Sequence, residues 1–211
     1  MVPSAYSSGK PSYGVGAGNV QVIFDSDIDF EDAAEKVIYG RSYDNGIICT
    51  GEQSVIYNEA DKDAVFAALR KRGAYICTEE EGKKMRALLF QNGGPINKDV
   101  VGQGVLNIAK MAGINVPEGS RVIIVEANGV GEEDVICREK MCPVMCALSY
   151  KHFEEGVDIA CRNLANEGNG HSCAIHSNNQ AHIILPGSKA TVSRIVVNAP
   201  SATTAGGHIQ N

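Results

Sequence analysis

The stretch that decides the fold runs from Val20 to Asn58 and reads VQVIFDSDIDFEDAAEKVIYGRSYDNGIICTGEQSVIYN. Its start, VQVIF, is typical of a buried strand, and Asp27 or Asp29 offers an N-cap to the amphipathic segment FEDAAEKVIYGRSY. A turn at Gly46 ends the expected helix, and QSVIYN again has the composition of a strand. This stretch therefore predicts a strand, a helix and a second strand.

The same alternation continues along the rest of the chain. Helices are expected near residues 62–72, 79–91, 102–112 and 152–166, and strands at RVIIVEAN (121–128), VMCALSY (144–150), CAIHS (173–177) and VSRIVVN (192–198). Strands that alternate with helices of about 10 to 15 residues predict an α/β domain whose mainly parallel sheet is flanked by helices.

Length and composition exclude several classes of function. With 211 residues, 44% of them apolar, the chain can bury an ordinary core. The net charge is −6 and Lys and Arg are scattered, which argues against nucleic-acid binding. The sequence shows neither a membrane-spanning apolar run nor a secretion signal, so we expect a cytoplasmic protein whose seven cysteines are free, buried thiols.

Two motifs are poor matches to known binding sites. The segment GVGAGN (14–19) superficially resembles a dinucleotide fingerprint, but a proline precedes it and a strand, not a helix, follows. A glycine loop that passes close to another backbone is the better interpretation. Cys137, Cys142 and Cys146 lack the CxxC spacing of zinc sites, so we expect no metal.

Cys49 differs from the other cysteines because its neighbours are polar or flexible. A thiol at a turn between a helix and a strand can face a cleft, where backbone N–H groups stabilise a thiolate and an oxyanion. A lone cysteine is, however, more often a small buried residue. Local chemistry leaves both interpretations of Cys49 open.

Two further side chains are candidates for a site. His171 follows two glycines in GNGHSCAIHS and can transfer protons near neutral pH, or it is an ordinary loop histidine; His176 lies within the strand and is the weaker candidate. Glu139, in REKMCPV, can accept hydrogen bonds from ribose hydroxyls, or it is a solvated loop residue.

Four segments carry a family resemblance: YDNGIICTGEQSVI, REKMCPVM, GNGHSCAIHS and SRIVVNAPSATTAGG. Their order and spacing resemble those of the CoA-acylating aldehyde dehydrogenases over nearly the whole chain. The chain looks most similar to acylating succinate-semialdehyde dehydrogenases, and next to the acetaldehyde dehydrogenase half of bifunctional aldehyde-alcohol dehydrogenases. The resemblance implies the fold of an aldehyde dehydrogenase catalytic domain.

The resemblance also implies an activity, the reversible oxidation of a small aldehyde to acyl-CoA with NAD or NADP as cofactor and coenzyme A as co-substrate. Cys49 matches the family nucleophile, which forms a thioester. Glu139 falls on the glutamate that holds the nicotinamide ribose, and His171 on a histidine of the acylating branch that we expect to assist the CoA thiol. The full-length enzyme is expected to be a homo-oligomer in the cytoplasm or in a bacterial microcompartment.

The chain departs from the hydrolytic relatives at one position. Those enzymes carry a general-base glutamate just upstream of the first strand, where this chain has SYGVGAGN without a carboxylate. Without a base to activate water, a thioester survives until the CoA thiol arrives. Two alternatives remain at this point: a hydrolytic aldehyde dehydrogenase that releases a carboxylic acid, and a non-enzymatic α/β domain whose cysteines are structural.

The resemblance suggests three segments in the chain. Residues 1–19 are expected to come from a domain junction, residues 20–200 to form the catalytic domain, and residues 201–211 to return toward a nucleotide-binding domain. The chain resembles an excised catalytic domain, which we expect to fold but to be inactive alone.

Overall fold

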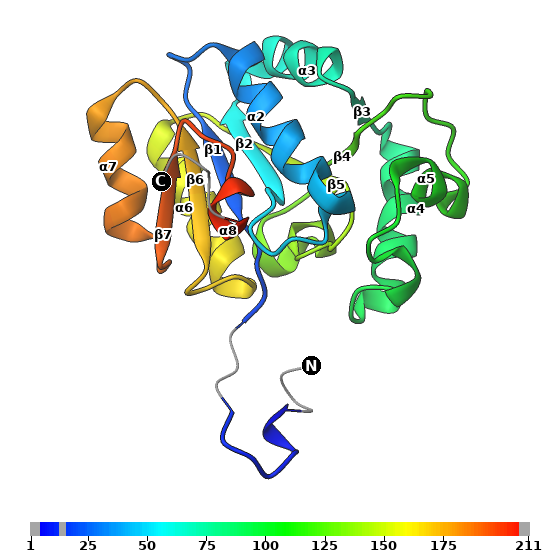
Figure 1. Ribbon diagram of the computed structural model, residues 1–211. Helices are drawn as coiled ribbons and strands as arrows, with labels where there is room; N and C mark the ends of the chain where they lie inside the picture. Colours follow the sequence, from blue (N-terminus) through cyan, green and yellow to red (C-terminus); the bar gives the residue numbers. More distant parts are fainter. Residues whose placement is uncertain (1–4, 13–15, 207–211) are drawn as a thin grey trace.

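Short apolar runs form the seven strands of a single sheet in the computed structural model, which describes residues 5–12 and 16–206 (Figure 1). The strands are β1 (Gln21–Phe24), β2 (Ser54–Asn58), β3 (Ala74–Ile76), β4 (Val122–Glu126), β5 (Val144–Tyr150), β6 (Ser172–His176) and β7 (Arg194–Val197). Their order is β3-β4-β5-β2-β1-β6-β7, and every neighbouring pair is parallel. The predicted α/β fold with a parallel sheet is confirmed.

Helices cover both faces of this sheet. They are α2 (Phe30–Ser42), α3 (Lys62–Lys71), α4 (Glu79–Leu89), α5 (Val105–Ala112), α6 (Phe153–Asn166), α7 (Gln180–Lys189) and the short α8 (Thr203–Gly206). Alternate strand residues point to opposite faces, so Val22 packs with α2 and α3, whereas Ile23 packs in the cluster that α4, α5 and α6 cover. Both faces of the central strands are therefore buried, as expected of a parallel sheet.

The N-terminus of α2 is capped by Asp29 rather than Asp27. The Asp29 side chain accepts the N–H groups of Glu31 at 2.9 Å and Asp32 at 3.2 Å. These bonds satisfy two donors that have no partner within the helix. The sequence offered both aspartates as caps, and the backbone geometry selects Asp29.

Two elements differ from the sequence-based expectations. Strand β3 has three residues, which are too few to show a period, and helix α7 was not predicted. Pro186 and Gly187 lie inside α7, and this pair usually indicates a helix end. Asn179 nevertheless caps the N-terminus of α7 through the N–H groups of Ala181 and His182.

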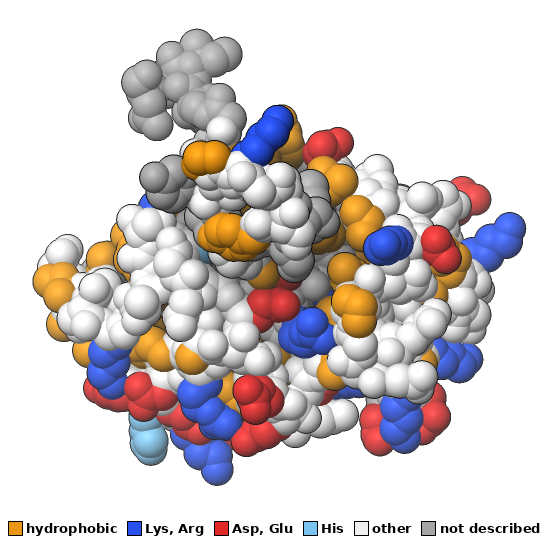
Figure 2. Space-filling model, turned by 90° about the horizontal axis from the view of Figure 1, so that it is seen from below, with side chains coloured by type: hydrophobic (Ala, Val, Ile, Leu, Met, Phe, Trp, Pro, Cys, Tyr) orange, Lys and Arg blue, Asp and Glu red, His pale blue; other side chains and the backbone are white. Residues whose placement is uncertain are grey.

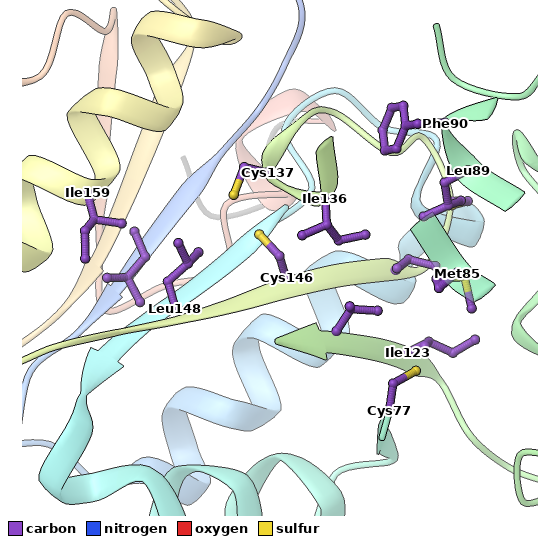
Figure 3. Close-up of a cluster of buried hydrophobic side chains, with 14 of the residues drawn as sticks. Cys77, Met85, Leu89, Phe90, Ile123, Ile136, Cys137, Cys146, Leu148 and Ile159 are labelled. Atoms are coloured by element: carbon purple, nitrogen blue, oxygen red, sulfur yellow. The ribbon is translucent and has the colours of Figure 1, made fainter. Parts of the chain in front are cut away.

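Most of the cysteines belong to the core. Five are buried, Cys161 is half-buried and Cys49 is exposed, and all seven are free thiols. Figure 3 shows the sulfur atoms of Cys137 and Cys146 pointing toward one another among the side chains of one apolar cluster. The expectation of free, buried thiols is confirmed for five cysteines; the exceptions are the half-buried Cys161 and the exposed Cys49.

The surface carries mixed charge. Figure 2 views the molecule from the side on which residues 16–19 lead into β1, and there Lys and Arg lie beside Asp and Glu rather than in one basic patch. Among the described residues, no helix is both long and apolar enough to cross a membrane.

Candidate active site

The amino ends of β2, β1, β6 and β7, four neighbouring parallel strands, meet at one edge of the sheet, where a hollow of about 580 Å³ lies. Cys49 precedes β2, His171 directly precedes β6, and Arg194 begins β7. The hollow is lined by Gly16, Cys49, Thr50, Asn169, Gly170, His171, Ser172, Ser193, Arg194, Thr204 and Ala205. Two of the three predicted site residues, Cys49 and His171, therefore face a common space.

The loop before β2 presents Cys49 to this space. Asp44, Asn45 and Gly46 have φ of 48°, 52° and 69°, so three successive residues adopt the left-handed conformation and turn the chain sharply after α2. A Cβ on Gly46 would lie 2.6 Å from the carbonyl carbon of Cys142, so only glycine fits there. After this turn the chain reaches Cys49, which is exposed.

Two backbone N–H groups close to Cys49 in the chain are free to bind a ligand. Within the described part of the chain, the N–H groups of Cys49 and Thr50 donate to no backbone or side-chain acceptor. Donors of this kind stabilise the oxyanion that forms when a thiolate attacks a carbonyl. The loop therefore offers a nucleophile together with groups that can hold the developing negative charge.

Gly18 lies between Cys49 and Glu139. Its N–H donates to Oε1 of Glu139 at 3.0 Å, and a Cβ on Gly18 would lie 2.3 Å from the Cys49 carbonyl oxygen. The expectation that the glycine loop passes close to another backbone is confirmed at Gly18. Gly14 and Val15 of the same segment lie outside the described residues.

Glu139 lies beside the hollow rather than in its lining. Burial raises the pKa of its carboxyl; the Gly18 N–H lowers it, and the nearby Glu167 raises it further. Glu167 also accepts the backbone N–H of Glu139 at 2.6 Å, which holds the loop in place. Glu139 is thus a half-buried acceptor on the far side of Gly18 from Cys49.

The backbone of His171 is fixed by hydrogen bonds, whereas its imidazole ring is not. Its carbonyl oxygen accepts the N–H of Ser193 at 3.1 Å and the Ser193 hydroxyl at 2.6 Å. Among the described residues, its buried Nδ1 has no hydrogen-bond partner. Burial, and then the positive charge of Arg194, lower the pKa of His171, so the imidazole is neutral at neutral pH and can accept a proton.

His176 is a core residue. It lies inside β6, and its ring meets the Phe24 ring edge-on with centroids 5.3 Å apart. Burial lowers the pKa of His176 to about 4, which keeps it uncharged. The buried position of His176 agrees with the sequence-based view that it is a weaker site candidate than His171.

Sequence reasoning missed Glu52 and Arg194. Glu52 is fully buried three residues after Cys49, and its Oε1 accepts the N–H of Ser201 at 2.5 Å. A Cβ on Gly40 would lie 1.9 Å from the other oxygen of Glu52, so a glycine in α2 makes room for the carboxyl. Neither residue stands in a pattern that indicates a site: the partner of Glu52, Ser201, is 149 residues away in the chain, and Arg194 begins the apolar run RIVV like an ordinary edge residue of a strand.

Two buried cations lie behind the site. The Arg41 guanidinium donates to the carbonyl oxygen of Cys142, and Nζ of Lys140 donates to the carbonyls of Ile136 at 2.8 Å and Arg138 at 2.6 Å. Burial lowers the pKa of both cations. In the described ranges, no group of three or more His, Cys, Asp or Glu side chains could hold a metal ion.

Comparison with known proteins gives clear relatives. No protein-family model matches the chain. Over 211 residues, its whole length, it is 52% identical to the succinate-semialdehyde dehydrogenase (acetylating) of Clostridium kluyveri, of which it spans 46%. It is 35% identical to the bifunctional aldehyde-alcohol dehydrogenase of Escherichia coli, with 100% of this chain and 24% of that protein aligned. The chain therefore spans less than half the length of these curated relatives.

Solved structures agree with these relatives. An acetylating aldehyde dehydrogenase from Geobacillus thermoglucosidasius is 36% identical with a TM-score of 0.89, over 96% of this chain and 44% of that one. A Rhodopseudomonas palustris propionaldehyde dehydrogenase with bound CoA and an acylated cysteine is 25% identical with a TM-score of 0.84, over 98% and 47%. An engineered glycolyl-CoA reductase with bound NADP+ is 26% identical with a TM-score of 0.86, over the same shares. The resemblance to acylating aldehyde dehydrogenases, and the fold that it implies, are confirmed.

Proposed function

We propose that this chain is the part of a CoA-acylating aldehyde dehydrogenase that carries the nucleophile, and that the protein containing it oxidises an aldehyde to acyl-CoA with NAD+ or NADP+. One observation carries the proposal: an exposed Cys49 and a neutral His171 line a common hollow. The similarity to acylating dehydrogenases over the whole chain supports it.

In the proposed reaction, the Cys49 thiolate attacks the aldehyde carbon and forms a C–S bond. The N–H groups of Cys49 and Thr50 stabilise the resulting thiohemiacetal oxyanion. A bound nicotinamide would supply the oxidant, by accepting this carbon's hydrogen as a hydride with its two electrons, and Cys49 would then hold the acyl group as a thioester. The thioester carbon is attacked by the CoA thiol, and the Cys49 sulfur departs as the leaving group.

His171 has a separate proposed role in the second half of the reaction. A neutral imidazole can take the proton of the incoming CoA thiol, because a thiolate rather than a thiol is the nucleophile. The lowered pKa of His171 keeps the imidazole in the accepting form at neutral pH. His171 therefore supports thioester transfer and not the formation of the thioester.

Glu139 is the proposed contact for the nicotinamide ribose. It is half-buried, its Oε1 already accepts the Gly18 N–H, and carboxylate oxygens accept hydrogen bonds from sugar hydroxyls. Such an acceptor suits the hydroxyl groups of a ribose at the edge of the hollow. Glu139→Gln should raise KM for the nicotinamide cofactor several-fold and leave KM for CoA unchanged.

The hydrolytic alternative is disfavoured by the hollow itself. Its described lining contains no Asp or Glu that could activate water. Glu52, although near in sequence, is fully buried and contacts Ser201 instead. A thioester on Cys49 should therefore persist until a thiol arrives.

The proposed boundaries and location follow the same resemblance. We assign residues 20–200 to the catalytic domain, residues 1–19 to a domain junction, and residues 201–211 to a return segment toward a nucleotide-binding domain. Seven free thiols suit a reducing compartment such as the cytoplasm, or a microcompartment within it. The proposed assembly is a homo-oligomer.

Product analysis tests the proposal. The protein that carries this chain, incubated with an aldehyde and NAD+, should release acyl-CoA when CoA is present and almost no free acid when CoA is absent. The Cys49→Ala variant should form neither product. Release of free carboxylic acid at equal rates with and without CoA would favour the hydrolytic alternative, and no reaction with any aldehyde would favour a structural domain.

A further inference from the structure

Glu167 follows α6 and bonds to the backbone of Glu139, the proposed ribose contact. Its Oε2 accepts the Glu139 N–H at 2.6 Å, across 28 positions of the chain. The other carboxylate oxygen lies 3.6 Å from Nη2 of Arg138, and the Glu167 N–H donates to the Asn163 carbonyl at 3.0 Å as the cap of α6. The carboxylate is thus held at the end of a 14-residue helix.

Asn19 ties the same two segments to each other. Its Nδ2 donates to the Cys137 carbonyl at 2.7 Å and to the Glu167 carbonyl at 2.9 Å. Asn19 is fully buried, so water does not compete for these bonds. The preceding residue, Gly18, donates to Oε1 of Glu139 at 3.0 Å. The glycine loop, the Glu139 loop and the end of α6 therefore meet around the Glu139 carboxyl.

The Glu139 loop depends on such contacts for its shape. Glu139 lies outside the helices and strands, and Met141, two residues later, has a φ of 37°, a conformation that side chains other than glycine rarely adopt. A backbone of this kind persists only where its surroundings hold it. Without the Glu167 carboxylate, the partly buried N–H of Glu139 would lose its acceptor.

Glu167 also acts on the charge of Glu139. The Glu139 carboxyl is faced by the Gly18 N–H, by the cations of Arg41 and Lys140, and by Glu167. Burial raises the pKa of Glu139 most; the N–H and the two cations lower it, and the negative charge of Glu167 raises it. A protonated carboxyl accepts fewer hydrogen bonds than a carboxylate, so this balance sets how well Glu139 can bind sugar hydroxyls.

We propose that Glu167 is a positioning residue of the nicotinamide site, which fixes both the place and the charge of Glu139. This inference rests on the proposed function, because it concerns the cofactor of the same site. Glu167 is not among the residues that line the hollow. Its effect on the cofactor therefore passes through Glu139.

Variants of two glutamates in the protein that carries the chain test the positioning role. Glu167→Leu removes the acceptor of the Glu139 N–H and should raise KM for the nicotinamide cofactor about 10-fold. Its kcat and its KM for CoA should stay within about 3-fold of the parent. Glu167→Gln keeps an acceptor oxygen and should hold KM for the cofactor within about 3-fold at neutral pH.

The matched control lies near the other end of the same helix. Oε2 of Glu155 accepts the backbone N–H of Lys151 at 2.8 Å, a bond of the same kind at an exposed position away from the hollow. Glu155→Leu should therefore leave both KM values within about 2-fold of the parent.

A pH profile tests the electrostatic part and does not require the leucine variant to fold. In the parent, kcat/KM for the nicotinamide cofactor should fall in acid as Glu139 takes up a proton. Glu167→Gln removes a charge that raises the pKa of Glu139, so this fall should move to lower pH. Glu155→Gln should leave the profile where it is.

Binding of NADH, followed by its fluorescence, separates the inference from the proposed function. A parent protein that makes no acyl-CoA, but whose affinity for NADH falls in Glu167→Leu and not in Glu155→Leu, would refute the proposed function and retain the role of Glu167. A parent that makes acyl-CoA, with the same KM for the cofactor in Glu167→Leu, would refute the inference alone.

Three further results would overturn the inference. Equal rises in KM for the cofactor and for CoA in Glu167→Leu would indicate a general structural role. Slower acyl transfer at an unchanged KM for the cofactor would assign Glu167 to the loop of His171, four residues later. An unchanged pH profile in Glu167→Gln would show that Glu167 does not set the charge of Glu139.

Discussion

The backbone N–H of Ser201 donates to Oε1 of Glu52 at 2.5 Å, within a fully buried contact between the Cys49 loop and the C-terminal segment. The Thr50 hydroxyl reinforces this contact by donating to the Ala202 carbonyl at 3.4 Å. The same segment continues to Thr204, which lines the hollow. Glu52 therefore fixes one wall of the proposed active site relative to its nucleophile.

This buried carboxyl predicts a pH dependence of stability. Burial raises the pKa of Glu52 from 4.5 to about 8, so between these values the folded protein keeps a proton that the unfolded chain releases. The contribution of Glu52 to stability is therefore complete below pH 4.5 and declines as the pH rises toward 8. Glu52→Gln still accepts the Ser201 N–H but does not ionise.

The free energy of unfolding of Glu52→Gln, relative to the parent, should thus increase by up to about 1.4 kcal/mol per pH unit across this window and level off above it. Urea unfolding at several pH values measures the difference. A difference that does not depend on pH would contradict the assigned pKa.

The close contact of Gly18 with the Cys49 backbone predicts that adding a methyl group at Gly18 destabilises the protein. Gly18→Ala would place a Cβ 2.3 Å from the Cys49 carbonyl oxygen, so the two backbones must separate. We expect a loss of about 1 to 3 kcal/mol in unfolding free energy. The alkylation rate of Cys49 should also change.

The matched control is Gly187→Ala, in which the new Cβ meets no atom within 4 Å. The free energy of unfolding of this variant should stay unchanged or rise slightly. Equal behaviour of the two variants would show that the Gly18 contact carries no strain.

The cysteines should differ in reactivity. Cys49 is exposed, whereas burial raises the pKa of Cys77 and Cys173 to about 12 and that of Cys142 to about 11. The neighbouring Cys137 lowers the pKa of Cys146, but Cys146 is fully buried and so out of reach of a reagent in the folded protein. Brief treatment of the folded protein with iodoacetamide should therefore modify Cys49 first, as peptide mass spectrometry would show. Earlier modification of Cys161, the half-buried thiol, would argue against an accessible nucleophile.

The role of His171 predicts a separation of the two half-reactions. His171→Gln should leave the burst of NADH from a single turnover within about 3-fold of the parent. Acyl transfer to CoA should slow by about 100-fold, the usual contribution of a general base. Burial and Arg194 lower the pKa of His171 from its ordinary value of 6.5. The rate of acyl transfer in the parent should therefore fall only when the pH drops below 6.5. This fall should be absent in the variant. A slower burst in the variant would move His171 to the first half-reaction.

Much of the fold followed from local patterns in the chain. Apolar runs such as VMCALSY specify strands, and Asp29 lies one residue before the helix that it caps. Patterns of this kind act over a few residues, so they can be read without the rest of the molecule. Helix α7 was missed because Pro186 and Gly187 contradict the helix that tertiary packing and the Asn179 cap support.

The sequence by itself determined the α/β alternation, and its motifs indicated Cys49, Glu139 and His171. Only the tertiary structure decided that Cys49 and His171 share a hollow with Arg194, and that Glu139 lies behind Gly18. The physical reason is that parallel strands bring their amino ends to one edge of the sheet whatever their separation in sequence. Burial, which sets the charge of groups such as Glu52, likewise depends on neighbours that the chain supplies from distant positions.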